Sequence, residues 1–497
     1  MRITMKNNNI TRIKFYTFFF LACFFLILPS AFPQAPDRSK PPEIGPPPSM
    51  KLPPIQRFKL SNGLPIVLVE KHDVPLVHIE LLVDAGTALD PADKEGWASI
   101  ATALMQDGAG TRDALQIADA IDFLGASIST SSGYHSCGVS LHTPLSKLDS
   151  AIVLFGDVAL SPMFPPAELD RNRKELLNEL IQWHDEPRAI ASVMFSHAVF
   201  GKTHPYGRQS IGTEKSIRSM AIDDVKAFYG KYFTPGNSTM IIVGDVTEKS
   251  IRGRLERIFG KWQGKEAKKV EIPKAEQVKG RQIYLVDKPG APQSEIRIGR
   301  VGVARLSEDY YALLVANTIL GGSFSSRLNQ NLREQHGYTY GANSRFDFRL
   351  YPGPFMAGSA VQTVITDSAI IEFMKELNRI LEPVSDEELT RARNYITLRY
   401  PESFQTIAQI AGKLIELEMY NLPDNYFSNF TKNVLAVTKS DVQRVAKKYI
   451  DPENIAIVIV GDRAQIEQKI AALNLGPIIH KTIPEVLGPM PVLEGDK

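Results

Sequence analysis

Two stretches of the chain carry one pattern: DVKAFYGKYFTPGNSTMIIVGD from Asp224 to Asp245, and DVQRVAKKYIDPENIAIVIVGD from Asp441 to Asp462. The Asp-Val start, the Tyr-x-x-Pro-x-Asn turn and the closing Gly-Asp coincide at one constant offset. Each copy predicts a helix, then a turn at the proline, then an apolar β-branched strand. The shared positions include turn and strand-end residues as well as core residues. The chain therefore contains two domains of one fold.

The length and the charge of the chain fit this organisation. A chain of 497 residues allows about two to four domains, each able to bury its own core. The net charge of +2 comes from 57 basic and 55 acidic residues that are dispersed along the sequence, so neither nucleic acid nor an acidic partner is indicated. One of the two cysteines, Cys23, lies in the leader, so Cys137 has no intramolecular disulfide partner.

The N-terminus has the pattern of an export signal, and residues 1–35 are predicted to be a signal peptide. Basic residues precede an apolar run from Phe15 to Leu28, which is short for a transmembrane span. Ala31 or Ala35 suits the cleavage point, and an uncleaved anchor is the alternative. Residues 36–54 are Pro-rich and predict an extended tether. A periplasmic or secreted location follows, with membrane contact only through an uncleaved leader.

The rest of the chain divides into two folded segments joined by a charged linker. Strands open and close each segment and helices lie between them, which predicts an α+β fold rather than a parallel, doubly wound sheet. The predicted parts are an N-terminal domain (55–263), a solvated linker (264–277), a C-terminal domain (278–475) and a tail (476–497). The clearest predicted strands are Pro65–Glu70 and His78–Val83. The clearest predicted helices are a long one from Gly96, one from Ala114, Ala167–Trp183, Tyr310–Leu320 and Asp386–Arg399.

The most specific segment is GGSFSSRLNQNLREQHGYTYGANSRF, from Gly321 to Phe346. Together with the duplicated ending and the loop His204–Gly207, it resembles the pitrilysin/insulinase family of zinc peptidases. The resemblance implies two homologous domains, each a mostly antiparallel sheet with helices packed on one side, which form half of a clamshell chamber around an unfolded peptide. It also implies an H-x-x-E-H zinc motif on a helix of one domain. An Arg and a Tyr that hold the substrate are implied in the other domain.

The zinc motif of the family is degenerate in this chain. Aligned on Gly96, the helix GWASIATALM places Ser99, Thr102 and Ala103 where the family has its two His and its Glu. Ala103 has no donor atom, and hydroxyl groups are poor zinc ligands. Glu179 falls near the family's third ligand, where it is either a remnant ligand or an ordinary exposed helix carboxylate, and the second interpretation is favoured. No metal and no catalytic residue is therefore assigned to this chain.

The Arg/Tyr motif of the family is retained. Arg333 and Tyr340 stand seven residues apart, as the family's pair does. The resemblance implies that Arg333 donates hydrogen bonds to a substrate carbonyl and that the Tyr340 hydroxyl donates to the developing oxyanion. Tyr338 is an alternative to Tyr340, because both are expected on one face of a strand. Taken alone, either residue would be an ordinary exposed helix residue or a strand packing residue.

A degenerate zinc half beside a retained substrate half predicts a non-catalytic, substrate-binding subunit of a two-chain zinc metalloprotease. The expected partners are a homologous H-x-x-E-H subunit, which carries the zinc, and an extended peptide that adds a strand to a sheet edge. The alternative is a peptide-binding or scaffold protein without hydrolysis. A stand-alone zinc endopeptidase ranks last, because neither H-x-x-E-H nor H-E-x-x-H occurs in the chain.

Overall fold

A computed structural model describes residues 45, 53–268 and 270–493 of the chain. The predicted signal peptide (1–35) and most of the predicted tether (36–54) lie outside the described residues. The described residues after Pro47 belong to one compact unit. None of the helices built from described residues combines the length and the apolar character that crossing a membrane requires.

Two six-stranded sheets form the framework of the described chain. The first sheet has the order β1 (Ile55–Lys59), β2 (Pro65–Glu70), β8 (Ser238–Gly244), β3 (Leu76–Val83), β7 (Cys137–Pro144) and β6 (Ser127–Ser132). The second sheet has the order β11 (Asn343–Phe346), β12 (Pro354–Gln362), β10 (Gln293–Val301), β13 (Ala456–Gly461), β9 (Gln282–Asp287) and β14 (Ile478–Lys481). In each sheet one of the two central strands pairs in parallel with its outer neighbour, β8 with β2 and β13 with β9, whereas the two central strands pair antiparallel with each other. The α+β fold with two domains of similar topology is confirmed.

The duplicated sequence accounts for the centre of each sheet. It forms helix α8 (Ile222–Tyr232) followed by β8, and helix α15 (Lys439–Tyr449) followed by β13. In the first copy the Asn237 amide closes the turn by donating to the Tyr232 carbonyl at 3.1 Å. In the second copy the Asn454 amide donates to Asp451 at 2.7 Å and accepts from the Gly280 N–H at 2.9 Å. The shared asparagine therefore fixes the turn that leads into the central strand.

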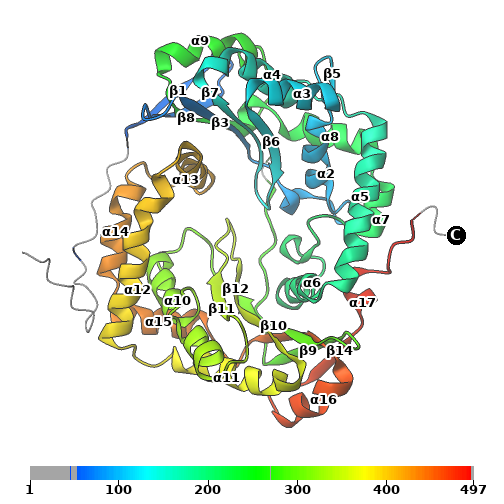
Figure 1. Cartoon of the computed structure of the whole chain (residues 1–497), viewed down its shortest axis with the longest axis vertical. Coiled ribbons are helices and arrows are strands. Elements are labelled where there is room, and N and C mark those ends of the chain that lie inside the picture. The colour runs from blue at the N-terminus through cyan, green and yellow to red at the C-terminus, as the bar shows by residue number, and fades with distance from the viewer. Residues whose placement is uncertain (1–44, 46–52, 269, 494–497) are drawn as a thin grey trace, which may run out of the picture. The chain divides into compact units, whose positions relative to one another are not determined.

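The helices gather around the two sheets, and the two halves of the chain lie at opposite ends of the long axis in Figure 1. In the first half they are α2 (Trp97–Ala103), α3 (Ala114–Leu124), α4 (Leu148–Leu160), α5 (Pro166–Asp185), α6 (Pro187–Phe200), α7 (Glu214–Ser219), α8 and α9 (Glu248–Phe259). In the second half they are α10 (Tyr310–Leu320), α11 (Thr366–Arg379), α12 (Asp386–Arg399), α13 (Ile407–Met419), α14 (Tyr426–Ala436), α15, α16 (Arg463–Ala472) and α17 (Ile483–Leu487).

Each half contributes one helix to the sheet of the other half. Helix α6 of the first half packs on β10 and β13 of the second sheet, and helix α13 of the second half packs on β3 and β8 of the first sheet. The Phe195 ring of α6 lies so close to Gly299 of β10 that a Cβ atom there would stand 2.7 Å from it. Leu414 of α13 belongs to a core that also contains Ile241 of β8. The two hydrophobic cores are therefore joined across the halves.

An arginine from the second half makes a further contact with the first half. The guanidinium of Arg349, between β11 and β12, lies 3.9 Å from the Tyr134 ring centroid and 4.5 Å from that of Tyr206. Tyr206 belongs to the loop His204–Gly207 and is itself fully buried. Cation–π contacts of this kind are stronger when they are shielded from water. The loop therefore holds the two halves together.

Three sequence expectations differ from the structure in detail. The helix after Gly96 is short, because the chain tightens into a 3-10 turn at Leu104–Gln106 and turns at Gly108, whose φ is +148°. The second sheet continues past Leu475, the expected end of the second domain, because β14 pairs in parallel with β9. The described residues of the linker 264–277 are irregular, yet they are not simply solvated, since Ile272 is buried.

Removing the Phe195 ring or the Leu414 side chain should destabilise the whole molecule. Phe195→Ala and Leu414→Ala should each lower the free energy of unfolding by about 3–5 kcal/mol, because each opens a cavity between an exchanged helix and a sheet. Urea unfolding followed by circular dichroism should remain one cooperative transition. Phe123→Ala is the matched control, since Phe123 is 82% exposed, and its effect should stay within about 0.5 kcal/mol. Separate transitions for the two halves would contradict the joined core.

Candidate functional site

The helix that should carry zinc ligands has none to offer. The Ser99 hydroxyl lies 3.0 Å from the Ser132 hydroxyl of β6 and donates to the Ser210 carbonyl at 3.0 Å. The Thr102 hydroxyl is buried and donates to the Ala98 carbonyl of its own helix at 2.8 Å. Ala103 is exposed and has no donor atom. Each of the three positions is therefore unfit for metal, either because its oxygen is already used or because it has none.

Glu179 does not rebuild a metal site. It is half-buried on α5, and no hydrogen bond or ion pair joins its side chain to α2 in the described part of the chain. No group of three or more His, Cys, Asp or Glu residues among the described residues is placed to hold a metal ion. The residues at the three α2 positions and Glu179 therefore do not fit the family's zinc.

A residue that the sequence analysis missed holds the start of the same helix. Asp90 is buried and accepts hydrogen bonds from the N–H groups of Gly96 at 2.9 Å and Ala98 at 3.0 Å. Burial raises the pKa of Asp90 to about 7, although these N–H groups favour the charged form. An Asp six residues before a helix-starting Gly is the sequence signal that could have identified it. Asp90 therefore fixes the start of the helix on which the family's zinc motif was expected.

The Gly321–Phe346 segment packs tightly at its start. A Cβ atom on Gly321 would stand 2.4 Å from the Ser344 nitrogen, and one on Gly322 would stand 2.6 Å from the Asn317 amide nitrogen. The Ser344 hydroxyl also donates to the Asn317 side chain at 2.8 Å. A side chain at Gly321 would clash because the backbone there passes directly against β11, and a side chain at Gly322 would press on Asn317 at the end of α10.

The turn that carries Arg333 is a π-helix, Asn329–Gln335, which is braced by charged residues beneath it. Arg327 makes a bidentate ion pair with Glu388 of α12, at 2.7 and 3.0 Å. Asn331 donates to Glu372 at 2.7 Å and to Glu376 at 2.9 Å, both on α11. Short π-helices often occur at functional sites. These contacts hold the turn in place and leave Arg333 at the surface.

Arg333 and Tyr340 are both presented outward, but they do not touch. The Arg333 guanidinium lies 4.3 Å above the Phe324 ring and 3.5 Å from the Glu334 carboxylate. The Tyr340 side chain is 95% exposed. No hydrogen bond or ring contact links Arg333 to Tyr340 in the described residues. The sequence pattern did not single out Phe324, which is 63% exposed and supports the guanidinium from one side.

The expectation that Tyr338 and Tyr340 share a strand face is wrong. Strand β11 begins only at Asn343, because the Thr339 hydroxyl accepts from the Gly341 N–H at 3.1 Å and folds the chain locally. Tyr338 stacks on His336, with 4.9 Å between the ring centroids, and packs against the core. Tyr340 is therefore the more exposed of the two tyrosines.

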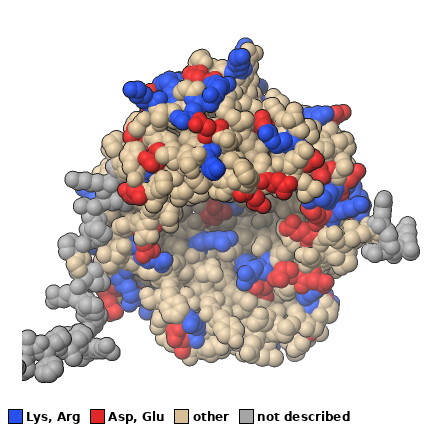
Figure 2. Space-filling model, turned by 45° about the horizontal axis from the view of Figure 1, so that its top comes forward, with Lys and Arg blue, Asp and Glu red and all other residues tan. Residues whose placement is uncertain are grey.

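The space between the two halves is open to solvent. Figure 2 shows a broad hollow between them, with Lys or Arg side chains inside it. In the described chain, β6 is an edge strand of the first sheet and pairs only with β7. Strand β11 is the corresponding edge of the second sheet and pairs only with β12. An edge strand leaves backbone N–H and C=O groups unpaired, so it can accept an extended peptide as an additional strand.

Comparison with known proteins identifies the class to which this fold belongs. Residues 66–214 match the family model described as insulinase (peptidase family M16), and residues 219–396 match the model described as peptidase M16 inactive domain. The chain belongs to the M16 peptidase family.

Its relatives and structural neighbours agree with this assignment. An uncharacterized zinc protease of Rickettsia bellii is 26% identical over 82% of this chain and 91% of its own length. The uncharacterized zinc protease YmxG of Bacillus subtilis is 26% identical over 58% of this chain and 69% of its own length. The crystal structure of a peptidase M16 inactive domain from Pseudomonas fluorescens superposes with a TM-score of 0.77 at 25% identity, over 82% of this chain and 98% of that chain. A protease from Helicobacter pylori has the same fold, with a TM-score of 0.74 at 20% identity over 82% of this chain and 100% of that chain.

The Arg327–Glu388 pair should make the stability of the motif depend on pH. Burial alone would raise the pKa of Glu388, but its hydrogen bonds from Arg327 and Ser385 lower it to about 2. A lowered pKa contributes stability above about pH 4.5, and this contribution is lost as the pH falls toward 2. Arg327→Met should therefore cost about 3 kcal/mol at pH 7 and clearly less at pH 3, measured by urea unfolding. Arg391→Met, which removes an exposed pair on α12, should cost less than about 0.5 kcal/mol at either pH.

The purified mature chain should bind no zinc in stoichiometric amounts. Equilibrium dialysis against zinc, followed by metal analysis, should leave less than one ion per ten chains, and a chelator should not change the unfolding temperature. The contrary result would be one bound zinc per wild-type chain and none in Glu179→Gln. It would indicate a metal site between α2 and α5.

Proposed function

We propose that this chain is the non-catalytic, substrate-binding subunit of a two-chain zinc metalloprotease of the pitrilysin/insulinase type. One contrast carries the proposal: the α2 positions hold no metal ligand, whereas Arg333 is half-buried on a braced turn and Tyr340, beyond that turn, is 95% exposed. The partner is a homologous subunit with H-x-x-E-H, which supplies the zinc and the activation of water. The substrate is an unfolded peptide, and the predicted signal peptide (1–35) supports a location in the cell envelope.

In the proposed complex, this chain binds and orients the peptide. Arg333 donates hydrogen bonds to a substrate carbonyl, and the planar guanidinium is held in place by the Phe324 ring. The Tyr340 hydroxyl donates to the oxyanion that develops when the scissile carbonyl is attacked. The peptide runs in extended form as an added strand at a sheet edge, so that main-chain hydrogen bonds give affinity with little sequence selectivity.

A second candidate function is peptide binding without hydrolysis, as a scaffold or chaperone-like protein. It is favoured by the absence of a contact between Arg333 and Tyr340 within the described chain, because a pair that acts on one carbonyl would be expected to converge. In this case the chain holds extended segments in the hollow, and no partner cuts them.

Affinity purification from the native envelope distinguishes the two candidates. A co-purifying M16 chain with H-x-x-E-H in about equimolar amount supports the split protease. Recovery of this chain alone, with peptide binding but no cleavage, supports the scaffold.

Kinetics on the two-chain complex test the residue roles. Tyr340→Phe should lower kcat about 100-fold, because it removes one oxyanion donor, and Arg333→Ala should lower kcat/KM by a comparable factor. The pure chain should show no peptidase activity. Tyr338→Phe and Arg391→Ala are the matched controls and should stay within about twofold of wild type. Unchanged turnover in both Arg333→Ala and Tyr340→Phe would refute the proposed roles.

A further inference from the structure

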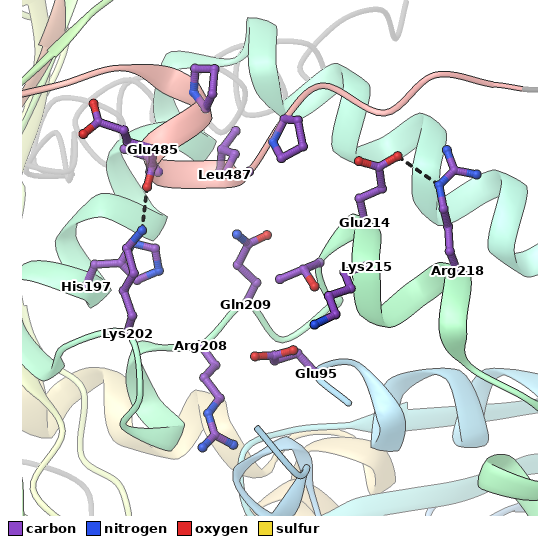
Figure 3. Close-up of a pocket in the computed structure, with 15 residues that line it drawn as sticks. Glu95, His197, Lys202, Arg208, Gln209, Glu214, Lys215, Arg218, Glu485 and Leu487 are labelled. Atoms are coloured by element: carbon purple, nitrogen blue, oxygen red, sulfur yellow. Dashed lines mark hydrogen bonds and ion pairs between the residues drawn. The ribbon is translucent and has the colours of Figure 1, made fainter. Parts of the chain in front are cut away.

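A second pocket lies away from the Arg/Tyr turn, beneath the C-terminal segment. It has a volume of about 430 Å³ and is walled by the end of α6, the loop before α7, α7 itself and residues Pro484–Pro489. Figure 3 shows these walls surrounding the side chain of Gln209, with Leu487 on the opposite side. A volume in this range suits a small ligand or a few residues of a peptide.

Two buried polar atoms in this pocket have no hydrogen-bond partner among the described residues. They are Oε1 of Gln209, a residue that is only 8% exposed, and Nδ1 of His197. The Gln209 amide points into the pocket in Figure 3. Burial, with a smaller contribution from Lys202, lowers the pKa of His197 to about 4, so this imidazole is neutral at pH 7. A buried acceptor without a donor is costly, and a ligand N–H group would satisfy Gln209.

The pocket also carries an excess of positive charge. Four cationic side chains line it against three carboxylates. Arg218 is paired with Glu214, and the Glu485 carboxylate is bound to the Thr482 N–H at the turn before α17. Lys215 is exposed and makes no ion pair in the described part of the chain. Water could satisfy Gln209, but an anionic group would also complement the net charge of +1 that these seven side chains give the lining.

The C-terminal segment supplies the apolar side of the pocket and is held in place at several points. Lys202 donates to the Glu485 carbonyl at 2.5 Å, and Arg218 donates to the Val492 carbonyl at 2.8 Å. His184 Nε2 lies 3.1 Å from the Gly488 carbonyl. Val486 and Leu487 are buried against α6. An apolar ligand group would meet this anchored wall.

We propose that this pocket binds the carboxyl end of a peptide whose last residue is apolar. Lys215 pairs with the terminal carboxylate, Gln209 Oε1 accepts from the last peptide N–H, and the final side chain packs against Leu487. These three contacts match the charge, the unused acceptor and the apolar wall of the pocket. The inference goes beyond the proposed function, and it requires neither the partner subunit nor Arg333 and Tyr340.

Isothermal titration calorimetry on the mature chain tests the proposal with N-acetyl-alanyl-leucine as the probe. The probe should bind saturably and at least tenfold more tightly than its C-terminal amide, which lacks the carboxylate. Gln209→Glu, which places a like charge beside the carboxylate, should weaken binding at least tenfold. Lys215→Met should weaken it at least fivefold. Lys226→Met, which removes an exposed lysine on α8, should stay within twofold of wild type.

The result that overturns the proposal is equal binding of the acid and the amide, or no saturable binding of either. Equal weakening by Lys215→Met and Lys226→Met would also overturn it, because it would indicate a general charge effect. Gln209 is buried, so the unfolding temperature of Gln209→Glu is measured first. If that variant does not fold, the exposed Lys215→Met variant and the acid–amide comparison still decide the outcome. None of these measurements involves cleavage, so failure here is distinct from failure of the split-protease proposal.

Discussion

The reciprocal exchange of α6 and α13 is the contact on which the rest of the molecule depends. The strands at the centre of each sheet are buried on both faces, as parallel and central strands usually are, so each sheet needs cover on two sides. The helices of the same half cover one face, and the exchanged helix covers much of the other. Because Phe195 fits over Gly299, the exchange also sets how closely the helix approaches the sheet.

This arrangement explains how an exposed motif can be well ordered. The π-helix that carries Arg333 is anchored by two contacts. Arg327 pairs with Glu388 of α12, and Asn331 donates to Glu372 of α11. Those helices belong to the same core that α13 joins to the first sheet. Arg333 and Tyr340 are thus at the surface while the residues beneath them are buried. A binding group benefits from such support, since less conformational freedom is lost when the substrate binds.

The two halves differ in what their side chains are free to do. In the first half, the Ser99 and Thr102 hydroxyls donate hydrogen bonds to backbone carbonyls, so they support the structure around α2 and are not free to bind a ligand. In the second half, the corresponding surface retains an aromatic platform, a cation and a phenol. The pocket at Gln209 lies beside the first of these regions, because the Ser99 hydroxyl donates to the carbonyl of Ser210, the next residue after Gln209. The two surfaces proposed to bind peptides are therefore the one around Arg333 and Tyr340 and the pocket at Gln209.

The sequence alone determined the duplication, the α+β class and the family. Strand periodicity, the Pro-x-Asn turn and the close backbone packing at Gly321 and Gly322 are local requirements that a sequence pattern records. The sequence also determined that Ser99, Thr102 and Ala103 offer no His or Glu to a metal, since donor atoms are a property of residue type. Only the tertiary structure decided that α6 and α13 exchange sheets, that Asp90 caps α2, and that β14 extends the second sheet. It also showed that Tyr338 packs against the core while Tyr340 is exposed, because the Thr339 turn replaces the strand that periodicity predicted. These features depend on contacts between residues far apart in the chain, which local pattern cannot specify.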